Sequence, residues 1–183
     1  AVPMDSEGYQ ASPHFFILEL NTSGIQVAPP MKLLALTGSR TSSIDLKNAL
    51  TDVEISPQTE SGPQTGGLAT TALAIGSTRA SLAILEQESF GRDTLKPISE
   101  ELNKEVLSLE AILFQAATYG IDTQERNLLR QRANTLVTRT SQATLTASKG
   151  AGFVEGHPIE RLIRESMFFL VWSCPQSVSE SLL

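Results

Sequence analysis

Residues 150–166 read GAGFVEGHPIERLIRES, a glycine-rich turn that runs through a proline into a charged helix start. Glycines let a backbone come close to a bulky ligand or to another chain. Pro158 suits the first turn of a helix, where its missing N–H costs nothing. Glu160 then lies near the positive N-terminus of that helix, which favours a carboxylate. The stretch therefore predicts a tight turn followed by a helix that begins near Pro158.

The composition of the 183-residue chain is that of an ordinary soluble globular protein, with 40% hydrophobic residues. A net charge of −6 argues against a nucleic-acid surface. No apolar run approaches the roughly 18 residues that span a bilayer, so we expect no membrane span. A single cysteine, Cys174, excludes an internal disulfide and fits a reducing, cytoplasmic location. Because the chain begins Ala-Val-Pro without an initiator methionine, we expect it to be a fragment.

The first third of the chain has the pattern of short β-strands. Short branched or aromatic segments alternate with Gly, Pro, Asn and Ser, which favours an antiparallel sheet. Residues 58–67 form a Pro-, Gln-, Thr- and Gly-rich linker between a β region at 1–57 and a helical region at 68–183. The candidate strands are 15–20, 25–27, 42–46 and 53–55, with a further apolar segment at 32–36.

The helical region shows apolar residues at helical spacing. The cleanest stripe consists of Leu102, Val106, Leu109, Leu113 and Ala116. A following helix carries Asp122 as its N-cap, with Glu125 three residues later in a capping box, and ends at Gly150. Its arginines Arg126, Arg130 and Arg132 are expected on a solvated face. Residues 167–172 read as a buried helical turn.

Residues 150–166 resemble the signature G-G-x-G-[YF]-x-x-x-x-P-[VI]-E-R-L-x-R-[DE] near the C-terminus of acyl-CoA dehydrogenases. Four β segments look like that family's order: the strand at 16–19, the turn at 24–27, the G-x-R-x-[ST] motif within 37–42, and the end strand at 52–57. The resemblance covers nearly all of the chain. It implies an α+β fold, in which a short antiparallel β segment, the remnant of a central β domain, precedes an antiparallel four-helix bundle.

The same resemblance implies FAD as the cofactor, in contacts that this chain partly changes. The family's R-x-x-F-G motif supplies an arginine to the FAD pyrophosphate of a neighbouring subunit. Here residues 87–91 keep Phe90 and replace that arginine by Gln87. The Q-x-x-G-G-x-G motif becomes residues 146–152, which keep Gly150 and Gly152 and place Lys149 at the first glycine. We expect cofactor contacts at these five positions, with Lys149 as a cation that meets a phosphate.

The family's catalytic base is missing at both of its usual positions. Dehydrogenation of an acyl thioester needs a carboxylate that removes the α-proton. Ser173 occupies the position of the glutamate in the family's Y-E-G-[TS] motif, and Ala69 occupies the alternative position on the first bundle helix. A serine hydroxyl cannot serve as that base unaided, so the catalytic residue is unknown.

Structural explanations compete with functional ones for several residues. The glycines of the turn either let the backbone approach a ligand or only allow the chain to reverse direction between two helices. Residues Glu160, Arg161, Arg164 and Glu165 are expected to form i,i+4 ion pairs, and His157 to be a loop residue. Cys174 is expected to be inert, and the aromatic residues Phe168, Phe169 and Trp172 to pack in the core.

Three functions remain open. The favoured one is an FAD-dependent acyl-CoA dehydrogenase-like oxidoreductase acting on acyl-CoA or another acyl thioester, as a homodimer or homotetramer. The second is a catalytically silent relative that acts as an assembly or scaffold protein. The third is a flavin monooxygenase on the same fold, which needs no α-proton base.

Overall fold

The computed structural model describes residues 15–51, 53–55 and 68–172. The chain divides into two compact units, Ala1–Ser61 and Gly62–Leu183. The boundary falls within residues 58–67, the range predicted as a linker, which lies outside the described residues together with Ser173 and Cys174.

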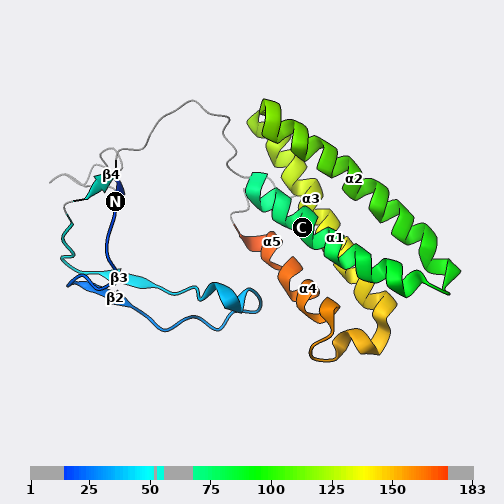
Figure 1. Ribbon diagram of the computed structural model, residues 1–183, viewed down its shortest axis with the longest axis horizontal. Coiled ribbons are helices and arrows are strands. Elements are labelled where there is room, and N and C mark those ends of the chain that lie inside the picture. Colours follow the sequence, from blue (N-terminus) through cyan, green and yellow to red (C-terminus); the bar gives the residue numbers. More distant parts are fainter. Residues whose placement is uncertain (1–14, 52, 56–67, 173–183) are drawn as a thin grey trace. The chain divides into compact units, whose positions relative to one another are not determined.

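The β unit consists of two antiparallel ribbons (Figure 1). Strand β1 (Phe15–Phe16) pairs with β4 (Glu54–Ile55), and β2 (Ile25–Val27) pairs with β3 (Ile44–Leu46). The predicted strand at 25–27 is present with the predicted bounds, and the other three are present but shorter. The single sheet that we expected is replaced by two two-stranded ribbons. Residues 32–36, the further apolar segment, are described by the structure and do not form a strand. They lead into the 3-10 turn η1 (Thr37–Ser39).

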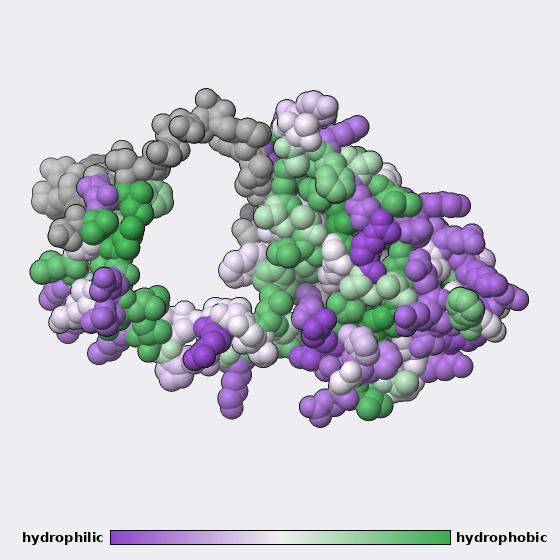
Figure 2. Space-filling view, viewed as in Figure 1, coloured by the Kyte–Doolittle hydropathy of each residue, from purple (hydrophilic) through white to green (hydrophobic). Residues whose placement is uncertain are grey.

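Gly24 is required by the turn that begins β2. Its φ of +87° lies in the left-handed region, and a Cβ there would collide with the carbonyl oxygen of Lys47. The close approach lets the backbone N–H of Lys47 donate to the Gly24 carbonyl at 2.8 Å. No described residue of the β unit is buried, and Figure 2 shows apolar side chains at the surface of the ribbons. Two-stranded ribbons of this kind need further covering to be stable.

The helical unit is a bundle in which successive long helices run antiparallel (Figure 1). Helices α1 and α3 run parallel and pack most extensively on each other, with α2 and the pair α4–α5 as their other neighbours. This arrangement confirms the predicted α+β architecture. The elements are α1 (Leu68–Ser89), η2 (Asp93–Leu95), α2 (Lys96–Tyr119), α3 (Thr123–Ser148), η3 (Lys149–Phe153), α4 (Pro158–Ser166) and α5 (Phe168–Val171).

The bundle core combines aliphatic residues with short polar side chains. Leu102, Val106 and Leu109 of the predicted stripe are buried, and Leu113 packs against them partly exposed. Some of the hydroxyls on α1 and α3 donate to backbone carbonyls, and the Thr144 hydroxyl donates to Ser81 O at 3.0 Å. Short side chains of this type allow two helices to approach closely. The buried serine and threonine side chains on α1 and α3 are those of Thr71, Thr78, Ser81, Thr140, Ser141, Thr144 and Ser148.

Two ion pairs fasten α2 to its neighbours. Arg79 on α1 donates from Nε to Glu110 Oε1 at 2.7 Å and from Nη2 to Oε2 at 2.5 Å, which is the bidentate geometry of an arginine–carboxylate pair. These hydrogen bonds lower the pKa of Glu110 and raise that of Arg79. On the opposite side, Arg139 of α3 pairs with Glu105 at 2.9 Å.

Helix boundaries follow the predicted signals with one difference. Asp122 and Glu125 form the complete capping box of α3, in which the Glu125 N–H donates to Asp122 Oδ1 at 2.8 Å. Pro158 begins α4 as predicted. Helix α3 ends at Ser148 with Lys149 as its C-cap, whereas Gly150 was expected to end it. Helix α5 covers the predicted turn at 167–172, although only Phe169 in it is fully buried.

Helix α1 has the length and the composition of a membrane span, although the sequence shows no long apolar run. Within its most apolar stretch, 44% is buried inside the bundle. Leu68, Ile75, Leu82 and Leu85 recur along one face and form part of the core. A core helix has this property, so α1 is weak evidence for a membrane span.

Candidate functional site

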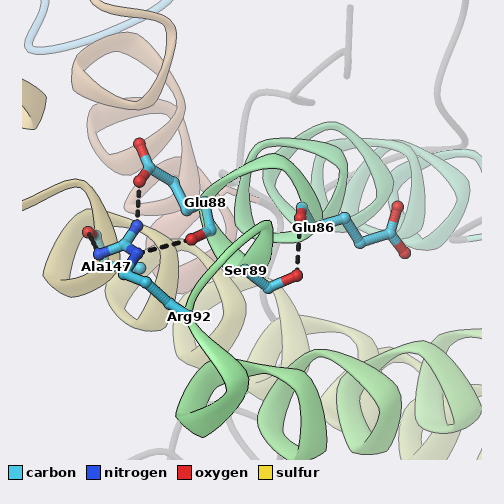
Figure 3. A network of polar contacts seen from close by, with 5 residues as sticks. All are labelled: Glu86, Glu88, Ser89, Arg92 and Ala147. Atoms are coloured by element: carbon cyan, nitrogen blue, oxygen red, sulfur yellow. Dashed lines mark hydrogen bonds and ion pairs between the residues drawn. The ribbon is translucent and has the colours of Figure 1, made fainter.

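One end of the bundle brings together the two segments that resemble cofactor motifs. Both α1 and α3 end there, and Arg92 joins them (Figure 3). Its Nη1 donates to the Ala147 carbonyl on α3 at 2.8 Å, and its Nε donates to the Glu88 carbonyl on α1 at 2.6 Å. Its Nη2 also pairs with the Glu88 carboxylate. The guanidinium thus covers carbonyls at both helix C-termini, where a cation is favoured.

A pocket of about 370 Å³ opens beside this junction. Arg92 and Lys149 supply positive charge, and Thr94 and Thr146 supply hydroxyls. Glu88 already neutralises Arg92, whereas no carboxylate of the described residues pairs with Lys149. The pocket therefore has one uncompensated cation. Its remaining lining is apolar and consists of Leu85, Leu95, Ile98, Ala143 and Ala147.

Lys149 has an unusual backbone conformation. Its φ of 55° and ψ of −144° lie near a region that glycine alone populates readily. Such strain costs on the order of 1–3 kcal/mol. A cation at a helix C-terminus gains only about 0.3–1 kcal/mol from the helix dipole. The dipole alone therefore does not account for a lysine here, at the position where the G-G-x-G signature has its first glycine.

The other predicted cofactor contacts lie at the same end of the bundle. Gln87 and Phe90 are at the C-terminal end of α1, and the Phe90 side chain is 92% exposed. Gly150 is open, with no heavy atom within 4 Å of a Cβ placed on it. Gly152 is buried, and a Cβ on it would lie 2.9 Å from Leu145 Cδ1 and 3.0 Å from Ile159 Cγ2. Gly152 therefore lets η3 pack against α3 and α4, and its contact with a cofactor stays a prediction.

The charged residues that follow the turn have structural partners. Arg164 pairs with Glu160 at 2.8 Å, and Arg161 pairs with Glu165 at 3.6 Å, which confirms the expected i,i+4 pairs. His157 is the N-cap of α4, where its Nδ1 accepts from the Ile159 N–H at 3.3 Å. These contacts stabilise the start of α4.

The described residues supply no carboxylate at the family's base position on the first bundle helix. Ala69 lies in the first turn of α1 with its side chain exposed. Ser173, at the other base position, lies outside the described residues. Among residues 15–51, 53–55 and 68–172, no group of three or more His, Cys, Asp or Glu residues is arranged to hold a metal ion.

Sequence reasoning placed Arg130 wrongly. It was expected on a solvated face, but it is only 4% exposed. Its Nη2 donates to the Trp172 carbonyl at 2.8 Å, and Asn134 donates from Nδ2 to the Phe169 carbonyl at 2.7 Å. Helical spacing from Val137 places both residues on the core face. The prediction followed only the leucines of this helix and therefore missed them.

Known proteins resemble this chain in structure and not detectably in sequence. No protein-family model and no curated protein matches the sequence. Butyryl-CoA dehydrogenase from Megasphaera elsdenii superposes with a TM-score of 0.72 over 98% of this chain and 52% of its own, at 18% identity. Glutaryl-CoA dehydrogenase from Mycobacterium smegmatis gives 0.75 over 91% and 49%, at 14% identity. A protein described as an FAD-dependent dehydrogenase gives 0.74 over 100% and 55%, at 14% identity.

The chain has the fold of the C-terminal region of acyl-CoA dehydrogenases. Identities of 12–18% establish the fold alone. The chain spans about half the length of these acyl-CoA dehydrogenase structures. In this acyl-CoA dehydrogenase fold, the segments predicted to contact FAD lie at one end of the bundle.

Proposed function

We propose that this chain is the bundle portion of an FAD-dependent oxidoreductase that resembles acyl-CoA dehydrogenases and uses an acyl thioester. The bridge from Arg92 to Ala147 carries the proposal. It joins the segment of Gln87 and Phe90 to the segment of Lys149 and Gly150, although more than fifty residues separate them along the chain. In a bundle whose successive helices run antiparallel, α1 and α3 finish at the same end, and the Arg92 bridge fastens the two segments to each other there.

The residues around the pocket fit part of a flavin dinucleotide. A dinucleotide presents a charged pyrophosphate beside flat, largely apolar rings, and the pocket presents Lys149 and two threonines beside an aliphatic floor. Its volume of about 370 Å³ is near the lower end of the roughly 300–1,000 Å³ of ligand sites. The bundle would therefore hold one portion of FAD. When bound, FAD supplies hydride transfer, while these residues bind and orient it.

The family's base position on the first bundle helix carries no group that could remove the α-proton. The methyl group of Ala69 cannot take a proton, and a carboxylate is needed within reach of the substrate carbon. We therefore expect that the 183-residue chain does not dehydrogenate an acyl thioester by itself. This expectation agrees with the extent of the chain, about half of its structural relatives.

An assembly or scaffold role is the second candidate, and the surface of α2 and α3 favours it. Leu107, Phe114 and Leu128 are 49%, 69% and 55% exposed on these helices. A groove of about 250 Å³ between α2 and α3 is lined partly by Ile112 and Leu129. Exposed apolar side chains of this kind are found at sites of association. They support the proposed homodimer or homotetramer, whether or not the protein is catalytic.

FAD binding tests the proposal directly. The chain is titrated with FAD, and flavin fluorescence and absorbance after gel filtration report binding. We expect saturable binding that Phe90→Ala weakens, because Phe90 is exposed at the proposed site. Phe114→Ala is the matched control, since it removes an exposed aromatic ring from another part of the bundle. Absence of saturable FAD binding would exclude the flavoprotein assignment.

Activity assays separate the three functions. With FAD, an acyl-CoA and an artificial electron acceptor, we expect no turnover by this chain. Turnover above that of a Ser173→Ala variant would exclude the silent scaffold. Oxygen consumption driven by reduced flavin, without an acyl thioester, would point to the monooxygenase. We also propose a cytoplasmic location, on the basis of the lone cysteine.

A further inference from the structure

We propose that Lys149 is a phosphate-binding residue, which contacts the diphosphate of a nucleotide in the pocket beside Arg92. The inference rests on the proposed function for the class of ligand. It adds the residue that would replace the arginine lost at Gln87. The strained backbone of Lys149 and the position of its side chain at a pocket with no other free cation are the two observations behind it.

The backbone conformation argues for a selected side chain. Glycine would adopt this φ and ψ without strain, and the same segment already has glycine at positions 150 and 152. A lysine that remains in a position suited to glycine indicates a role for its side chain, since strained residues cluster at functional sites.

The charge balance of the pocket argues for an anion. Arg92 is held by Glu88 and by two backbone carbonyls, so its charge is already compensated. The Lys149 ammonium has no carboxylate partner among the residues that the structure describes. Thr94 adds a hydroxyl to the same lining, whereas the Thr146 hydroxyl donates to the Gln142 carbonyl at 2.9 Å and offers its oxygen only as an acceptor. An ammonium beside a hydroxyl group is a suitable site for phosphate oxygens.

The shape of the pocket argues for a nucleotide over a free phosphate. Five of its nine lining residues are aliphatic, and its volume of about 370 Å³ exceeds the needs of one small anion. An ADP unit offers both a diphosphate and an apolar base. Because FAD and coenzyme A both contain that unit, the experiment has to distinguish them.

The experiment measures ADP binding to the full chain by calorimetry at low salt. We compare wild type with Lys149→Gln, Lys149→Arg and the control Lys104→Gln, which removes an equal charge from an exposed site on α2. We expect about tenfold weaker binding in Lys149→Gln and little change in the other two variants. Equal affinity in the two glutamine variants, or no ADP binding by wild type, would refute the inference.

A second measurement separates a binding role from a structural one. Lys149→Gly is expected to raise the melting temperature by about 2–4 °C through relief of strain, and to weaken ADP binding. A lower melting temperature would show that the lysine is required for the fold, and would count against the inference.

Competition experiments identify the ligand and keep the two proposals apart. Displacement of ADP by FAD, or by coenzyme A, assigns the nucleotide to the cofactor or to the thioester, and either result supports the inference. FAD binding that is insensitive to Lys149→Gln would refute the inference and leave the flavoprotein proposal intact. ADP binding that depends on Lys149, without any FAD binding, would support the inference and refute the flavoprotein proposal.

Discussion

Arg130 on α3 donates a hydrogen bond to the backbone carbonyl of Trp172 at 2.8 Å, 42 residues later in the chain. Four residues along α3, Asn134 donates to the carbonyl of Phe169. Carbonyls at the end of a helix have no partner within that helix. The two side chains therefore cap α5 and fasten the end of the described chain to the bundle.

Replacing Arg130 by methionine should destabilise the bundle by about 2–3 kcal/mol, because the change removes the hydrogen bonds that Arg130 donates to the Trp172 carbonyl and to Asn134 Oδ1. Thermal or urea denaturation measures the effect. Arg132→Met is the matched control, since Arg132 is only partly buried, and it should change stability by less than about 0.5 kcal/mol. Similar losses in the two variants would show that Arg130 has no special role.

The pair of Arg79 and Glu110 should make stability depend on pH at the acidic end. Arg79 lowers the pKa of Glu110 in the folded state. Its contribution to stability is therefore complete above the glutamate's unfolded pKa and decreases as the pH falls through the folded pKa. Because both side chains are partly exposed, the effect should be below about 1 kcal/mol.

Urea unfolding of wild type and Glu110→Gln at a series of pH values tests this dependence. The difference in free energy of unfolding between wild type and Glu110→Gln should be constant near neutral pH and should decrease in acid. A difference that grows as the pH falls would contradict the assignment. Glu101→Gln serves as a control, because Glu101 is exposed on the same helix and forms no ion pair with another described residue.

Gly152→Ala should destabilise the helical unit by about 1–3 kcal/mol. The added methyl group would lie within 3.1 Å of Leu145, Ser148 and Ile159, which overpacks the junction of η3 with α3 and α4. Gly150→Ala, with open space around it, should have little effect. Denaturation of the two variants side by side distinguishes a packing glycine from an open one. A harmless Gly152→Ala would refute the packing role.

Asp122→Ala should cost about 1 kcal/mol, because it leaves the Glu125 N–H at the start of α3 without its side-chain acceptor. Helix content by circular dichroism and the urea midpoint both report this loss. Thr123→Ala, one residue later, keeps the cap and should be nearly neutral. Equal effects at the two positions would show that the capping box adds nothing to stability.

The sequence alone was sufficient to predict the helices, their order and several of their ends. Asp122 with Glu125, and Pro158 at the start of α4, are local signals, because caps and proline act on neighbouring residues. The apolar stripe of α2 could also be predicted, since helical periodicity indicates which face of a helix is buried. The long motif at 150–166 predicted the fold that the structural comparisons confirm.

Only the tertiary structure decided what lies next to these elements. The burial of Arg130 depends on the return of α5 to α3, and the pocket depends on the bridge from Arg92 to Ala147. The strain at Lys149 is a property of how the chain leaves α3. The burial of Arg130 and the pocket arise from contacts between segments far apart in sequence, whereas local patterns report only the preferences of neighbours along the chain.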